Sequence, residues 1–164
     1  MADAEANKAL IKSLYDGLDR HDGEAMAACY APDAHFRDPA FGDLHGEEVG
    51  GMWRMLAGRA ADLKVDLPEH DAEGDSGTAH WIAHYTFTPT GRPVVNDIRA
   101  SFRFKDGKIV DHVDEFNFGK WAKQALGPPL GTLIALIPPM AALPRKRARA
   151  QLDEFLGGQT STAD

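Results

Sequence analysis

The sequence predicts an α+β fold in which a curved antiparallel sheet, shaped as a cone, wraps around three N-terminal helices and continues into an extra C-terminal helical tail. Two observations predict this fold. Apolar residues recur with the helical period up to about residue 60, and then with the strand period of two between residues 63 and 118. Helices followed by a run of strands are typical of an α+β domain with the helices on one face of the sheet.

Three helices are predicted in the N-terminal part. The first covers residues 4–20, and one of its faces is apolar: Ala6, Leu10, Leu14 and Leu18. Asp22 suits the N-cap of a second helix that ends near Tyr30. The third helix begins at Gly46 and ends at about Ala60. Residues 34–38 form a short strand before it, because the proline that follows Asp38 favours an extended backbone.

The middle of the chain is predicted to form the larger part of the sheet. Its runs are rich in Val, Ile, Thr and aromatic residues, and Gly, Pro and Asp separate them. The dipeptide Asp106-Gly107 is a strong signal for a tight hairpin between the last two strands. Strands are therefore expected at residues 63–68, 78–88, 94–104 and 109–118.

The C-terminal part differs in composition. Helical turns at 121–126, a short apolar segment and a last helix at 145–155 are separated by Gly and Pro. We therefore expect a cone domain, residues 1–122, and a helical extension, residues 123–164, that packs on the same domain and has a disordered end. The last helix opens with four cations, Arg145, Lys146, Arg147 and Arg149. They contact a membrane surface or a partner, or they form a solvated face.

Composition restricts the classes of function. The chain has 164 residues, 18 Lys and Arg against 25 Asp and Glu, a net charge of −7 and a pI near 5.4, so we expect no nucleic-acid partner. The single cysteine, Cys29, excludes an internal disulfide framework. No apolar run has transmembrane length, and no signal-peptide pattern begins the chain. We therefore expect a cytoplasmic protein without an integral membrane segment.

The order and spacing of several motifs over residues 6–122 resemble the SnoaL-like and ketosteroid-isomerase-like family of the nuclear transport factor 2-like superfamily. The matching motifs are Leu18-x3-Asp22, Tyr30-Ala31-x-Asp33-Ala34-x3-Asp38-Pro39, Gly46-x6-Trp53, Gly91-Arg92, Phe102-Arg103-Phe104 and Asp106-Gly107-Lys108-Ile109. The resemblance implies a cone with an apolar pocket in its mouth and a homodimer formed through the outer face of the sheet. Members include isomerases, polyketide cyclases, epoxide hydrolases, dehydratases and binding modules, so the fold does not fix the function.

The resemblance assigns residues one by one. Asp38 falls where steroid isomerases keep their proton-shuttling aspartate, Trp53 on a pocket aromatic position, and Tyr30 on a tyrosine that supports the oxyanion hole. The two oxyanion donors of those enzymes fall on Leu14 and Ala100, with Tyr15 one position away. Losing one such donor costs about 10²–10³ in rate, so steroid isomerase chemistry is disfavoured.

The last strand offers a second polar pair. His112 and Asp114 share one face with Val110 and Phe116, because side chains alternate along a strand. The resemblance makes this the pocket face and likens Asp114 to the acid/base carboxylate of limonene-epoxide hydrolases and SnoaL-like cyclases. Those hydrolases also need an Arg-x-Asp pair, where this chain has His80-Trp-Ile-Ala-His84, so their activity is disfavoured too. A structural pair is the alternative for His112 and Asp114.

The leading hypothesis is a protein that binds a small apolar, carbonyl- or hydroxyl-bearing molecule and transfers protons as an isomerase, cyclase or dehydratase without a cofactor. Asp38 would be the general base, and Asp114 with His112 the acid or electrostatic partner. Tyr30 and Asn96 would orient the substrate, and Trp53, Tyr85 and Phe116 would shape the pocket. The alternatives are that Asp38 only caps a turn and that the domain is a non-catalytic binding or interaction module. No metal site is expected, because His80 and His84 would lie about 13 Å apart along a strand.

Overall fold

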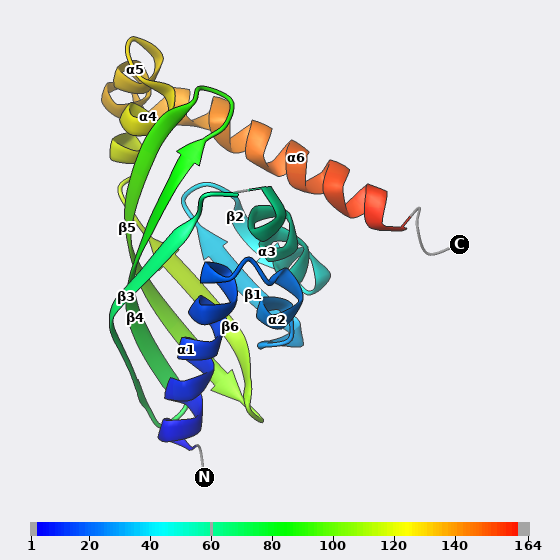
Figure 1. Cartoon of the computed structure of the whole chain (residues 1–164). Coiled ribbons are helices and arrows are strands. Elements are labelled where there is room, and N and C mark those ends of the chain that lie inside the picture. The colour runs from blue at the N-terminus through cyan, green and yellow to red at the C-terminus, as the bar shows by residue number, and fades with distance from the viewer. Residues whose placement is uncertain (1–2, 60, 161–164) are drawn as a thin grey trace.

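The structure, a computed structural model, describes residues 3–59 and 61–160 and confirms the predicted α+β cone (Figure 1). One sheet holds all six strands in the order β2-β1-β6-β5-β4-β3. The strands are β1 (Tyr30–Asp38), β2 (Gly42–His45), β3 (Lys64–Glu73), β4 (Ser76–Phe87), β5 (Arg92–Lys105) and β6 (Lys108–Glu115). The helices are α1 (Ala4–Asp19), α2 (Gly23–Ala27), α3 (Glu47–Arg59), α4 (Phe118–Leu126), α5 (Leu130–Leu136), the 3₁₀ helix η1 (Pro138–Ala141) and α6 (Ala142–Thr160).

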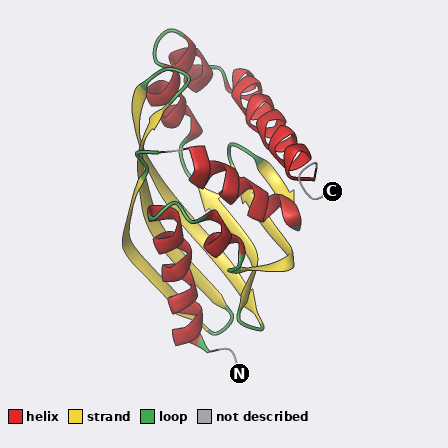
Figure 2. Ribbon diagram, turned by 45° about the vertical axis from the view of Figure 1, so that its right-hand side comes forward, coloured by secondary structure: helices red, strands yellow, loops and turns green. Residues whose placement is uncertain are grey.

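The N-terminal helices fill the concave side of the sheet (Figure 2). Leu14 and Leu18 of the predicted apolar stripe are buried, together with Ile11 beside them. The stripe is wrong at its start, because Ala6 is exposed and Leu10 is only partly buried. The buried side chains of α1 meet inward residues of the strands, where β5 alternates strictly between exposed and buried positions over most of its length. The core of the molecule therefore lies between the helices and the inner face of the sheet.

The sheet differs from the prediction in the extent of its strands, because β1 begins at Tyr30, where a helix was expected to end, and β3 continues to Glu73. It differs in topology as well. It is mixed, because β1 pairs with β6 in parallel whereas the other neighbours are antiparallel. The segment from Phe41 to Gly46, predicted as a loop, contains β2, which pairs with β1 through His35 opposite His45. The pairing of β1 with β6 joins segments that are far apart in the sequence, and β2 is only four residues long. A local pattern of apolar residues reveals neither feature. The predicted end of the third helix at Ala60 and the expected disorder at 161–164 fall outside the described residues.

The C-terminal tail lies against the cone at the end where β1 stops. A second apolar cluster joins α4, α5 and η1 through Phe118, Ala122, Ile134 and Ala141. Farther along, α6 packs on α3, where Leu152 is fully buried. Polar contacts tie α6 down as well, because Arg149 pairs with Glu48 of α3. Within residues 3–59 and 61–160, no helix has the length and apolarity needed to cross a membrane.

Close packing of α5 on α4 gives a testable consequence. A Cβ atom on Gly131 would lie 2.3 Å from the backbone oxygen of Ala122 and 2.9 Å from Cα of Lys123. Because backbone atoms cannot rotate away, we expect Gly131→Ala to lower the free energy of unfolding by about 1–3 kcal/mol in urea denaturation. The matched control is Gly58→Ala on α3, where a Cβ would meet nothing within 4 Å. A Gly131→Ala protein as stable as the control would contradict this packing.

Candidate functional site

Two carboxylates meet on the inner face of neighbouring strands. The parallel register pairs Phe36 with His112 and Arg37 with Val113, so one residue further along Asp38 stands beside Asp114. Side chains alternate along each strand, and both aspartates therefore share the inward side with Phe36 and His112, whose rings meet edge to face at 5.0 Å. Adjacent strands lie about 4.8 Å apart. Asp38 and Asp114 therefore occupy neighbouring positions on the inner face, and the charge of Asp114 acts on Asp38.

Asp38 is the last residue of β1, and hydrogen bonds hold one of its two carboxyl oxygens. The Oδ1 atom accepts hydrogen bonds from the backbone N–H of Ala40 at 2.9 Å and of Phe41 at 2.6 Å. Among the described residues, no hydrogen bond reaches Oδ2. Burial raises the pKa of Asp38 to about 7, and the charge of Asp114 adds to the rise, although the N–H of Phe41 and of Ala40 lower it. Near neutral pH this carboxyl group can therefore both take up and release a proton.

A buried polar chain runs from Trp53 to Trp81 through the centre of the cone. The Nε1–H of Trp53 donates to the Tyr30 hydroxyl at 2.9 Å, and that hydroxyl lies 2.7 Å from Nδ1 of His112. On the other side of the imidazole, Nε2 lies 2.8 Å from Oδ1 of Asp114, which also accepts from Nε1–H of Trp81 at 3.3 Å. His112 is fully buried and Asp114 nearly so. Polar groups at this depth need such partners.

The donors in this chain define how its protons can be arranged. Both indole N–H groups can only donate. With the proton of the imidazole on Nε2, Tyr30 accepts from Trp53 and gives its own proton to Nδ1 of His112, and Nε2–H donates to Oδ1 of Asp114. Each nitrogen and hydroxyl of the chain, and Oδ1 of Asp114, then has a hydrogen-bond partner. The chain holds Asp114 in a fixed position beside Asp38.

Tyr15 adds a hydroxyl that the sequence did not assign to the site. Its ring lies 5.1 Å from that of Trp81, and burial raises its pKa well above the usual tyrosine value, with the charge of Asp114 as the second cause. Of the side-chain polar atoms in residues 3–59 and 61–160, its hydroxyl alone is buried without a hydrogen-bond partner. The resemblance places the expected donor at Leu14, one position before Tyr15. In the structure both residues are buried, so the neighbouring position also points into the core.

A cleft of about 850 Å³ opens beside the two carboxylates. The end of β1, the turn into β2 and the end of β6 form its walls, and the start of α6 completes them. Asp38 and Asp114 both line it, together with three cationic side chains: Arg37, Arg145 and Lys146. Arg145 is fixed there, because its Nε donates to the backbone oxygen of Pro39 at 2.6 Å and its guanidinium lies 4.6 Å from the Phe118 ring centroid. The sequence does not predict this position of Arg145, because it depends on contacts between the tail and residues about 100 positions earlier.

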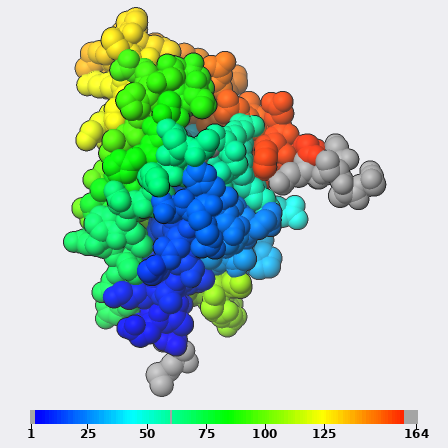
Figure 3. Space-filling model, in the orientation of Figure 1, coloured from blue at the N-terminus to red at the C-terminus, as the bar shows by residue number. Residues whose placement is uncertain are grey.

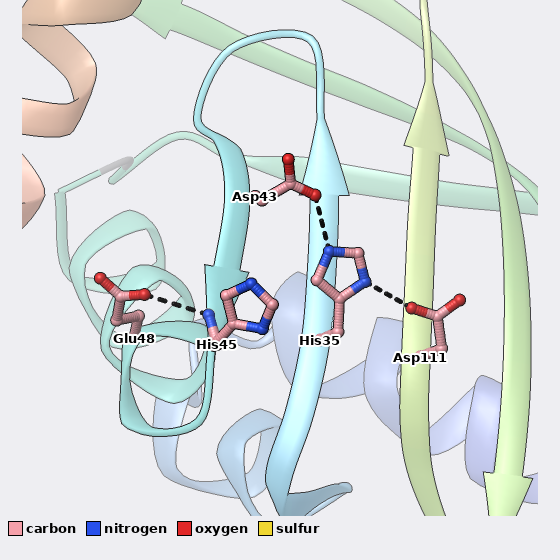
Figure 4. A network of polar contacts seen from close by, with 5 residues as sticks. All are labelled: His35, Asp43, His45, Glu48 and Asp111. Atoms are coloured by element: carbon pink, nitrogen blue, oxygen red, sulfur yellow. Dashed lines mark hydrogen bonds and ion pairs between the residues drawn. The ribbon is translucent and has the colours of Figure 1, made fainter.

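The outer wall of the cleft carries a second polar network (Figure 4). His35 on β1 lies between two carboxylates, with Nδ1 2.6 Å from Asp111 on β6 and Nε2 2.7 Å from Asp43 on β2. These hydrogen bonds raise the pKa of His35 above its usual value of 6.5. The ring of His45 lies beside that of His35, with the centroids 4.9 Å apart. When His35 is charged, this network binds the three strands that carry the site to one another.

The remaining predicted residues fall into two places. Tyr30 and Trp53 belong to the buried chain and contact His112. Tyr85 and Asn96 lie farther along the sheet, where the Tyr85 hydroxyl accepts a hydrogen bond from Nε1–H of Trp121 at 2.7 Å. Asn96 is buried on the inward face of β5 and does not line the cleft. Phe116 packs between the core of the cone and the cluster under the tail. The structure therefore does not bring all eight predicted residues around one cavity.

The two histidines of β4 point away from the core. His80 pairs with Asp97 at 2.8 Å, and His84 pairs with Asp66 at 2.9 Å, both on the outer face of the sheet. In the part of the chain that the structure describes, no group of three or more His, Cys, Asp or Glu side chains could hold a metal ion. These histidines therefore act as cross-strand partners of carboxylates.

The cone with helices in its hollow is the nuclear transport factor 2-like fold. A family model, described as the SnoaL-like domain, matches residues 11–112. The chain belongs to this SnoaL-like family. No curated protein matches its sequence.

Solved structures with the same fold come from several bacteria. An epoxide hydrolase of the limonene-epoxide-hydrolase-like type from Mycobacterium tuberculosis is 18% identical and superposes with a TM-score of 0.65, over 82% of this chain and 98% of its own. A protein of unknown function from Burkholderia pseudomallei is 21% identical, with a TM-score of 0.64 over 73% and 96%. A putative polyketide cyclase, IdmH, from Streptomyces antibioticus is 23% identical, with a TM-score of 0.60 over 71% and 95%. At these identities the likeness establishes the fold.

Two tyrosines allow a matched test of the buried chain. Tyr30→Phe leaves the N–H of Trp53 and Nδ1 of His112 without their partner, whereas Tyr15→Phe removes a hydroxyl that has none. We expect Tyr30→Phe to lower the free energy of unfolding by about 1–3 kcal/mol and Tyr15→Phe to leave it unchanged or raise it. Urea denaturation followed by circular dichroism measures both. Equal losses in the two variants would show that the Tyr30 hydroxyl is not held as described.

Proposed function

We propose that this protein is a cofactor-free enzyme that moves a proton on a small apolar molecule bearing a carbonyl or hydroxyl group. The observation that carries the proposal is the pairing of Asp38 with Asp114 on the wall of one cleft. A carboxyl group that titrates near the working pH is suited to general acid/base catalysis. The remaining groups of the site supply complementary roles.

The proposed roles follow from the contacts of each group. Asp38 takes a proton from a carbon next to the substrate carbonyl through Oδ2, which the backbone N–H groups leave uncovered. Asp114 and His112 provide the electrostatic partner, and the chain from Trp53 fixes their positions. The hydroxyl of Tyr15 has no partner, but it is buried and does not line the cleft, so no contact with the substrate is assigned to it. Asp38 then returns the proton to another atom, which completes an isomerisation, cyclisation or dehydration.

The structural neighbours fit this class of chemistry to different degrees. A putative polyketide cyclase with the same fold supports ring closure or isomerisation as the reaction type. Another neighbour is an epoxide hydrolase, but β4 of this chain carries His80-Trp-Ile-Ala-His84 and lacks the Arg-x-Asp pair that the resemblance to limonene-epoxide hydrolases requires. Proton transfer at carbon is therefore proposed ahead of epoxide opening.

A second candidate is a ligand-binding module without catalysis. The favouring observation is that the buried chain from Trp53 to Trp81 satisfies its own hydrogen bonds without any ligand, while large side chains occupy the inner wall of the cone. In that case, Asp38 would recognise a ligand donor and would not abstract a proton. The two candidates differ in whether Asp38 is needed for turnover.

Two further expectations stay proposals. A homodimer would form through the outer face of the sheet, where exposed charges such as Arg99 and Glu69 lie. The molar mass from light scattering would test it. A cytoplasmic location is the second, and the net charge of −7 is compatible with it.

The raised pKa of Asp38 predicts a conflict between stability and activity. Because the folded pKa of about 7 exceeds the unfolded value of 3.8, the folded state binds the extra proton, and stability falls as pH rises through this interval. The cost of the buried charge is complete above pH 7 and absent below 3.8. We expect Asp38→Asn to raise the free energy of unfolding at alkaline pH by about 1–3 kcal/mol. The exposed Asp33→Asn is the control, and a stability gain that did not grow with pH would contradict the assignment.

Proton abstraction itself can be tested without the natural substrate. A panel of small ketones and enones is incubated with the protein in heavy water, and deuterium uptake next to the carbonyl is followed by NMR. We expect exchange that increases as pH rises through about 7 and that falls by about 10²–10⁴ in Asp38→Asn. Retained turnover in both Asp38→Asn and Asp114→Asn would disprove the catalytic role and favour the binding module.

A further inference from the structure

The exposed large apolar side chains of this protein gather in the C-terminal tail. Leu136 is 70% exposed and Leu143 is 62% exposed, and Leu130, Leu133 and Ile137 are also solvent-accessible. The sixth, Val95, adjoins the tail, because its backbone exchanges hydrogen bonds with Gln124 of α4. Exposed apolar side chains that gather in one segment of a protein mark a candidate interaction site.

The spacing of these side chains places them on outward faces. Leu130, Leu133 and Leu136 recur every three residues of α5, whereas Gly131 and Ile134 on its other side are buried. On α6, Leu143 shares a face with Lys146 and Arg147, three and four residues later, and Leu152 is buried on the opposite side. We call the set Leu130, Leu133, Leu136, Ile137, Leu143, Lys146 and Arg147 the basic apolar face.

The charge of the tail is opposite to that of the rest of the chain. Residues 118–152 contain six Lys and Arg and no Asp or Glu, although the whole chain carries −7. In Figure 3 this segment, coloured yellow to orange, forms one end of the molecule, away from the N-terminus. The protein is therefore an acidic body with a basic, apolar cap.

We propose that the basic apolar face binds the surface of a membrane that contains anionic lipids. Leucine side chains enter the boundary between headgroups and acyl chains, and lysine and arginine side chains contact the lipid phosphates. The acidic body is repelled by the same surface, which allows only the tail to approach it. An anionic membrane surface contacts both the exposed apolar side chains and the positive charges at this end of the molecule.

A second copy of the chain fits this face less well. Two tails face to face would bring the cations of one against the cations of the other. A tail against the body of another copy would meet a surface without apolar partners, because the exposed large apolar residues of the described chain all lie in the tail or beside it. A lipid surface supplies negative charge and an apolar layer together.

Vesicle flotation tests the proposal with the full chain. We expect binding to vesicles of phosphatidylcholine mixed with phosphatidylglycerol, none to phosphatidylcholine alone, and weaker binding as salt increases. Replacing Lys146 and Arg147 together by Gln should weaken binding about 25-fold, at about fivefold for each charge. The double variant Leu136→Ser and Leu143→Ser should weaken it at least about tenfold.

Matched substitutions at the other end of the molecule serve as controls. Lys12→Gln with Lys105→Gln removes two exposed cations outside the tail and should leave vesicle binding unchanged, and circular dichroism confirms that all variants are folded. No binding to anionic vesicles would overturn the proposal. So would binding that the leucine variant retains in full, since charge alone would then hold the protein. A concentration-dependent dimer that the leucine variant abolishes, without vesicle binding, would assign the face to a second copy instead.

Discussion

The parallel pairing of β1 with β6 is the constraint on which the site depends. It joins strands that are some 75 residues apart in sequence, His35 beside Asp111 and Phe36 beside His112. One register shift would turn Asp38 from the inner face to the outer face, because side chains alternate along a strand. The same pairing lets His35 bridge to Asp111 on the outside while Phe36 packs on His112 on the inside. Both faces of this strand pair therefore fix the register that brings two carboxylates together.

Burial treats those two carboxylates differently. Asp114 is enclosed in the core and accepts hydrogen bonds from an imidazole and an indole, whereas Asp38 is only half fixed by two backbone N–H groups at the rim. A charged group in such surroundings costs free energy unless partners compensate for the lost water. At Asp38 the two N–H groups compensate only partly for the lost water, and its pKa is therefore raised. Asp38, whose charge the fold compensates less completely, is therefore the carboxylate that can still interact with a ligand through Oδ2.

How much the sequence could predict depended on whether a feature was local. The helical stripe of Leu14 and Leu18 and the hairpin at Asp106-Gly107 arise from neighbouring residues, and the structure has both. The alternation of β6 placed His112 with Asp114 on one face. The neighbour of Asp38 on the next strand, the burial of Tyr15 and the arrival of Arg145 at the cleft all depend on contacts across the fold. Periodicity carries no information on such contacts: it places Asn96 and Tyr85 on the inner face of the sheet, but neither residue lines the cleft.

The tail connects the proposed chemistry with the charge division of the molecule. Without α6, the cleft beside Asp38 would keep only Arg37 of its three lysine and arginine side chains, because Arg145 and Lys146 both come from α6. These side chains begin the same helix that carries Leu143 outward, and Lys146 belongs to both surfaces, so the wall of the cleft and the basic apolar face adjoin on one element. Binding at the outer side of α6 therefore acts on an element that also forms part of the wall of the cleft. The tail thus belongs to the site physically, although the matched family region ends at residue 112.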